Sequence, residues 1–202
     1  AKKADMVGYA VHTAITASII SGAILTAVGF FGAPLALRAM GTPEDVLVFA
    51  TLYIRIYFLG TIPNLIYNIG SGILRAVGDS KRPLYFLMAS CFTNILLDIL
   101  LVILLRFGIA GAAIATIFSQ CVSAFLVIFT LTRTKDLHSL VLSKLGLDMR
   151  MLKRIIHIGL PSGLQSSMYG MSNVIIQSSI NALGTDTVSA WAAYGKIDAI
   201  FG

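Results

Sequence analysis

Long apolar stretches separated by short polar turns make up most of this 202-residue chain. Hydrophobic residues account for 57% of it and charged residues for 12%, whereas roughly a quarter of the residues of a soluble domain are charged. A soluble domain of this size could not cover so much apolar surface. A helix needs about 20 predominantly apolar residues to span a bilayer. The pattern therefore predicts an all-α fold, a polytopic bundle of transmembrane helices in a lipid bilayer.

The predicted spans are residues 6–40, 44–77, 84–105, 109–131, 155–183 and a segment that begins near 187. Thr42 and Pro43 fit the N-cap and first position of the second helix. Pro63 predicts a kink within it, because proline has no N–H for the helical ladder. The very short turn at 106–108 makes the third and fourth spans an antiparallel hairpin.

The long polar stretch, residues 132–154, is the best candidate for a linker between two halves of the protein. Leu147, Met151 and Ile155 recur there at helical spacing among basic residues, which suggests an amphipathic helix at the membrane interface.

Lysines and arginines are distributed unequally between the two sides of the predicted membrane. Sorting the loops alternately leaves only Arg38 and Arg106 on one side. The other side receives Lys2, Lys3, Arg75, Lys81, Arg82, Arg133, Lys135, Lys144, Arg150, Lys153 and Arg154. Basic residues favour the cytoplasmic side, so the long basic loop is predicted to be cytoplasmic. The same clustering explains the net charge of +6 without a nucleic-acid partner.

The segment TNILLDILL, residues 93–101, places a carboxylate inside an apolar span. Asn94 precedes Asp98 by four residues and so shares its helix face. Thr116 lies about 9 Å along the next helix from the turn, close to the depth of Asp98, at about 10 Å. These oxygen donors suit a sodium ion, or a proton on the carboxylate. A purely structural, hydrogen-bonded Asp98 is the alternative.

Other polar residues of the spans are weaker candidates. Asn64, Asn68 and Ser71 form a stripe after Pro63 that fits either a cavity lining or interhelical hydrogen bonding. Arg55 is expected at the membrane interface, and Cys91 and Cys121 are expected to be small buried side chains. No catalytic arrangement and no nucleotide or cofactor motif is present in the sequence, so an enzyme is the least favoured class.

Four segments in order resemble the multidrug and toxic compound extrusion (MATE) family: APLALRAMGTPEDVLVFATLYIRI, GILRAVGDSKRPLYF, NILLD and GIAGAAIATIFSQ. The similarity is closest to its bacterial branch related to DNA-damage-inducible protein F. The resemblance implies an interior fragment of a twelve-helix, two-bundle transporter. Residues 1–133 would form helices three to six of the N-terminal bundle, residues 134–154 a cytoplasmic basic linker, and residues 155–202 the start of the C-terminal bundle. The remaining helices would belong to the same full-length chain.

By the resemblance, Asp98, Asn94 and Thr116 would contribute to the coupling-cation site of the N-terminal bundle. Asn68, Gln120 and Ser123 would face its cavity, and Asn64 is added from the polar stripe. The region from Leu160 to Ile176 contains no acidic residue, which departs from a branch that carries one on the seventh helix.

The expected function is proton- or sodium-coupled export of small organic, often cationic, compounds across the inner membrane, with no cofactor beyond the coupling ion. Two alternatives remain at this point. One is a flippase for lipid-linked precursors in the same superfamily, for which Arg55 and Lys196 are the available cationic residues. The other is a membrane protein in which Asp98 is purely structural.

Overall fold

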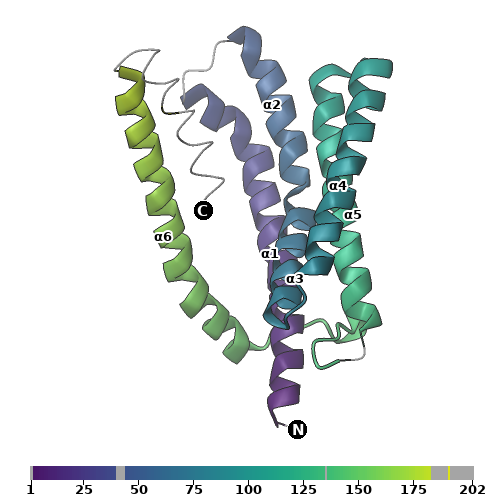
Figure 1. The fold of residues 1–202 in the computed structure, drawn as a ribbon. Helices are drawn as coiled ribbons and strands as arrows, with labels where there is room; N and C mark the ends of the chain where they lie inside the picture. Colours follow the sequence, from purple (N-terminus) through teal and green to yellow (C-terminus); the bar gives the residue numbers. More distant parts are fainter. Residues whose placement is uncertain (1, 40–43, 135, 183–190, 192–202) are drawn as a thin grey trace. The chain divides into compact units, whose positions relative to one another are not determined.

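The computed structural model describes residues 2–39, 44–134, 136–182 and 191, and every element within them is helical (Figure 1). The predicted helix start at Thr42 and Pro43 and the sixth span from 187 therefore lie outside the described residues, apart from residue 191. The helices are α1 (Lys2–Ala39), α2 (Glu44–Leu59), α3 (Thr61–Ala76), α4 (Lys81–Asp98), the π-helix η1 (Ile99–Leu104), α5 (Gly108–Arg133), the 3-10 helix η2 (Leu142–Lys144) and α6 (Met149–Ala182).

Three described helices are long and apolar enough to cross a membrane: α1 from Met6, α4 with its continuation to Leu104, and α5. The pair α2 and α3, bent by 42°, makes a fourth. The prediction of a helical membrane bundle is thus confirmed. Helix α6 is 34 residues long but is not in this set, because its glycine, serine and other polar residues lower its mean hydropathy.

The chain divides into two compact units, residues 1–152 and 153–202. In the first unit α5 packs against α2, α3 and α4, while α1 packs against α2 and α3. The core joins the helices to the linker and consists of Val11, Ile15, Leu74, Val127, Leu131 and Leu140.

The bend between α2 and α3 lies at Gly60, one turn before Pro63. A proline ring collides with the carbonyl of the residue four positions earlier, which is Leu59, the last residue of α2. Pro63 itself lies in the first turn of α3, where a missing N–H costs little. The predicted kink is therefore present, but it lies at Gly60, before the proline.

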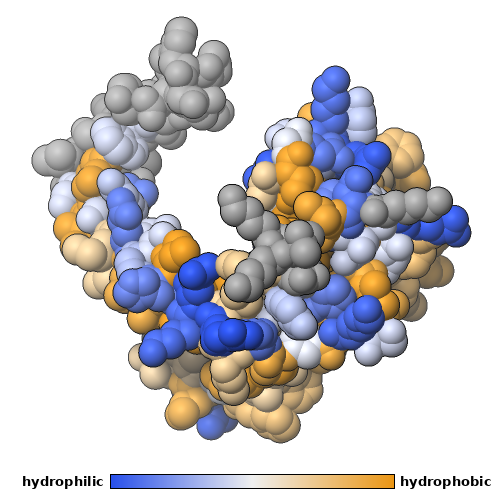
Figure 2. All heavy atoms as spheres, turned by 90° about the horizontal axis from the view of Figure 1, so that it is seen from below, coloured by the Kyte–Doolittle hydropathy of each residue, from blue (hydrophilic) through white to orange (hydrophobic). Residues whose placement is uncertain are grey.

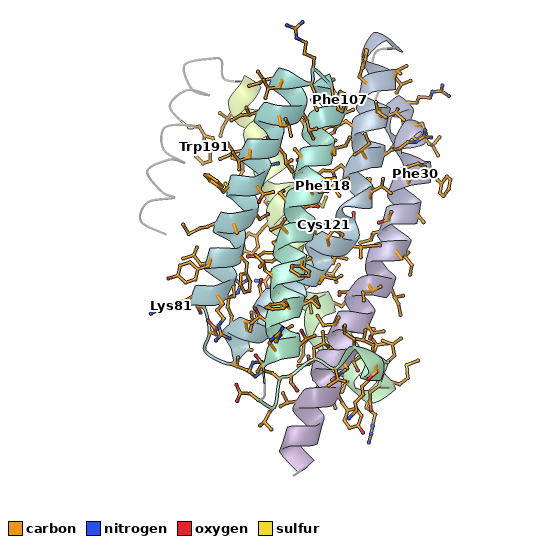
Figure 3. All side chains as sticks on the ribbon, turned by 90° about the vertical axis from the view of Figure 1, so that its right-hand side faces the viewer. Phe30, Lys81, Phe107, Phe118, Cys121 and Trp191 are labelled. Atoms are coloured by element: carbon orange, nitrogen blue, oxygen red, sulfur yellow. The ribbon has the colours of Figure 1, made fainter. Side chains whose placement is uncertain are left out.

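The outer surface of the helices is apolar. Phe31, Phe118 and Phe125 are 75%, 60% and 65% exposed, as expected for side chains that face lipid. Figure 3 shows Phe118 and Cys121 on α5. Both cysteines are exposed, so the expectation that they are buried is wrong. They occupy the outer faces of α4 and α5 because interhelical contacts there use Ser90 and the small residues of α5 instead.

Two hydrogen bonds join the linker to the N-terminal half of α1. The Val141 N–H donates to His12 Nε2 over 3.1 Å, and the Asp148 N–H donates to Thr13 Oγ1 over 3.1 Å. The Asp148 carboxylate in turn accepts the N–H groups of Arg150 and Met151, so it caps α6. Of the predicted amphipathic stretch, Leu147 precedes this cap, and the residues from Met149 onward form the first turns of α6.

Candidate functional site

A hydrogen bond between α4 and α5 shows which residues of the two helices lie at the same height along the helix axes, and so where the predicted ion-site residues lie. Ser90 Oγ donates to the Ser119 carbonyl over 2.6 Å, and both side chains are buried. In an antiparallel pair, moving up α4 corresponds to moving back along α5. Asn94 is therefore level with the residues next to Thr116, and Asp98 lies about one turn, or 6 Å, further along the axis.

Asp98 is half-buried at the end of α4, and its Oδ1 atom is buried without a hydrogen-bond partner. The Thr116 hydroxyl donates to its own helix, to the Ala112 carbonyl at 3.0 Å. Among the described residues no hydrogen bond joins Asp98 to Asn94 or Thr116. A buried polar atom without a hydrogen-bond partner costs free energy, and Asp98 Oδ1 is one such atom among the described residues.

The helix changes geometry immediately after Asp98. Residues Ile99–Leu104 form a π-helix, and the Leu105 N–H donates to the Leu100 carbonyl, five residues earlier, over 2.9 Å. Such wide turns are rare and recur at functional sites. The run ILLVIL shows no feature that distinguishes it from an ordinary apolar helix, so sequence reasoning missed this element.

The described residues contain no group of three His, Cys, Asp or Glu side chains that could hold a metal ion. An ion at Asp98 would therefore complete its coordination with amide, hydroxyl or carbonyl oxygens.

The four residues predicted to contact substrate fall into two places. On α3, Asn68 is exposed and its Nδ2 donates to Asn64 Oδ1 over 2.9 Å. On α5, Ser123 is buried and its hydroxyl donates to the Gln120 carbonyl over 2.9 Å. Ser123 is thus occupied within its helix, while the Asn64–Asn68 pair is accessible.

Gln120 lies against the bend between α2 and α3. Its Oε1 is buried without a partner, and a Cβ added at Gly60 would collide with that atom. Sequence reasoning missed Gly60, although glycine near a proline in an apolar span is a signal for such a close approach.

Comparison with known proteins places the chain among described transporters. The MatE family model matches residues 1–100. The probable multidrug resistance protein YpnP of Bacillus subtilis (strain 168) is 36% identical over 179 residues, which cover 86% of this chain and 39% of that protein. YoeA, a probable multidrug resistance protein of the same organism, is 32% identical over 209 residues, covering 99% and 44%.

A crystal structure of MATE in the bent conformation superimposes with a TM-score of 0.80 at 25% identity, over 98% of this chain and 49% of that one. The chain spans about two fifths of the length of the two curated relatives, and its branch within the family stays a prediction. The family model, the sequence relatives and the shared fold together show that the chain belongs to the MATE family.

Proposed function

We propose that the chain is part of a cation-coupled antiporter that exports organic or cationic compounds by alternating access. Asp98 binds the coupling proton or sodium ion, with Asn94 and Thr116 as neighbouring oxygen donors. The observation that supports this most is the buried Asp98 Oδ1 without a hydrogen-bond partner. The printed names of the relatives, multidrug resistance proteins, support organic compounds as cargo.

The ion can drive transport only if it binds one conformation more tightly than the other. The π-helix after Asp98 offers a way to achieve this. A change between π and α geometry would rotate the end of the helix and alter the donors around the carboxylate. Substrate would contact the exposed Asn68, its half-buried partner Asn64 and Gln120, while Ser123 acts through the backbone of α5.

We also propose that the protein is a multi-pass protein of the inner membrane with residues 132–154 in the cytoplasm. The distribution of Lys and Arg supports this orientation. By this proposal the protein is a transporter and not an enzyme. The coupling ion is transported in exchange for the organic compound, and no cofactor takes part.

The test is efflux by the full-length protein in sodium-free and sodium-containing buffer across a pH range. Asp98→Asn should retain expression but lose the dependence of efflux on the ion. Asp148→Asn is the matched control, because Asn caps a helix as well as Asp does and this residue precedes α6. Ion-dependent efflux that survives in Asp98→Asn would refute the assignment.

The flippase alternative gains no support from Arg55. Its Nε donates to the Phe30 carbonyl over 3.1 Å, and its guanidinium lies 5.2 Å from the centre of the Phe30 ring. This arginine is thus held by α1. Lys196 lies outside the described residues.

A further inference from the structure

A small charged cavity lies at the end of the bundle where α4 begins and α5 finishes. It has a volume of about 390 Å³ and is lined by Arg82, Phe129, Thr130, Arg133, Thr134 and Asp136. Figure 3 shows Lys81 at this end of α4 and Phe107 at the opposite end. Seen from below, this face of the molecule carries hydrophilic residues among hydrophobic ones (Figure 2). The cavity therefore lies at the end of the bundle where α4 begins, away from Asp98 at the other end of α4.

Its two arginines are held in different ways. Arg82 Nε lies 3.2 Å from Asp79 Oδ2, so this charge is largely matched within the protein. The Arg133 guanidinium lies 5.0 Å from the centre of the Phe129 ring, a cation–π contact that orients it without neutralising it. Among the described residues, Asp136 forms no ion pair. The cavity thus presents one unmatched cation and one unmatched anion.

An apolar track leads away from the cavity along α5. The Phe129 ring stacks on Phe125 with 5.9 Å between centroids, and the exposed Phe118 lies two turns further. On neighbouring α4, Tyr85 and Met88 are 60% and 59% exposed. A molecule with a charged head in the cavity would therefore lay its apolar part against a lipid-facing surface.

We propose that this cavity binds the headgroup of a phosphatidylethanolamine lipid. The Arg133 guanidinium would bind the phosphate, which its planar donors suit, with Arg82 beside it. The Asp136 carboxylate would accept hydrogen bonds from the primary ammonium group. The acyl chains would follow the aromatic residues of α5. Basic pockets between transmembrane helices bind the headgroups of anionic lipids, and Asp136 makes this one fit a zwitterion better than a pure anion.

The experiment measures lipid retained by the purified full-length protein, using phosphatidylethanolamine, phosphatidylglycerol and phosphatidylcholine with identical acyl chains. Native mass spectrometry gives the bound fraction of each. Phosphatidylethanolamine should be retained most. Phosphatidylcholine should be weaker because its quaternary ammonium has no N–H to donate.

Two variants separate the roles of the charges. Arg133→Gln should lower retention of phosphatidylethanolamine and phosphatidylglycerol about two- to fivefold, the range expected for one exposed ion pair. Asp136→Asn should lower only phosphatidylethanolamine and leave phosphatidylglycerol unchanged or stronger. Arg106→Gln, in the turn between η1 and α5, is the control and should change neither.

Several outcomes would overturn the proposal. Preference for phosphatidylglycerol in the wild type would mean an anion site, and equal retention of all three lipids would mean no headgroup recognition. Displacement of the lipid by millimolar inorganic phosphate would mean that the cavity binds free phosphate. An equal loss in Arg106→Gln and Arg133→Gln would mean that surface charge, and not this cavity, holds the lipid.

Discussion

Gly70 of α3 and Val127 of α5 form one of the closest approaches in the bundle. A Cβ added at Gly70 would collide with Val127 Cγ1. Val127 is completely buried, and a valine in a helix has one strongly preferred side-chain rotamer, so it cannot turn away. Gly70→Ala should therefore push α3 and α5 apart, although alanine is the better helix former.

The expected cost is that of overpacking, about 1–3 kcal/mol, less the gain of up to about 1 kcal/mol from replacing glycine in a helix. The middle of these ranges is a net loss of about 1 kcal/mol, which lowers the folding equilibrium constant roughly fivefold. Gly72→Ala provides the control on the same helix, because nothing lies within 4 Å of its added Cβ. That variant should be neutral or slightly stabilising.

The assay measures the unfolding of the detergent-solubilised full-length protein by thermal or denaturant titration. Gly70→Ala should unfold earlier than the wild type, and Gly72→Ala should not. Val127→Ala removes the colliding methyl groups, so the double variant Gly70→Ala, Val127→Ala should be more stable than the sum of the single losses predicts. Additive losses, or equal effects of Gly70→Ala and Gly72→Ala, would refute the claim that α3 and α5 meet at this contact.

Three further predictions concern the bend and the linker. Gly60→Ala should reduce transport more than stability, because its Cβ would displace the Gln120 side chain; efflux and unfolding measured on the same preparation decide, and a parallel loss of both would contradict it. Thr13→Val removes the acceptor of the Asp148 N–H, which should cost about 1 kcal/mol of stability and speed amide exchange across residues 140–149. Thr132→Val is the control, because the Thr132 hydroxyl donates within its own helix, and it should not change this exchange. The pKa of Asp148 is lowered, chiefly by the Met151 N–H that donates to its carboxylate, so its stabilising effect is present above the ordinary aspartate pKa of about 3.9 and is lost as pH falls through the lowered value. The protection of amides at the start of α6, measured against the exchange rate of an unstructured chain at the same pH, should therefore fall on acidification in the wild type and change less in Asp148→Ala.

Much of the helical organisation could be predicted from the sequence because hydrophobic length alone decides it. The hairpin of α4 and α5 follows from two apolar runs and a short turn, and the structure confirms it. Counting residues from the turn places Asp98 and Thr116 at nearly the same depth. Counting from the Ser90–Ser119 hydrogen bond instead places Asp98 roughly 7 Å beyond Thr116, and a π-helix that the sequence does not signal lies between Asp98 and the turn.

Features that depend on contacts between helices could not be predicted in this way. The π-helix after Asp98 arises in a run of apolar residues with no local signal. The close approach of Gln120 of α5 to Gly60 at the bend is a contact between helices, which no single helix reveals. The exposure of Cys91 and Cys121 depends on which face of each helix meets a neighbour.

The central claim is that Asp98 carries the coupling ion. Its most direct test is cation movement against substrate in proteoliposomes that contain the full-length protein, followed with a pH-sensitive dye and with radioactive sodium. In the wild type, substrate added on one side should drive a proton or sodium ion in the opposite direction. In Asp98→Asn this exchange should vanish while substrate binding remains. Exchange at the wild-type rate in Asp98→Asn would contradict the account.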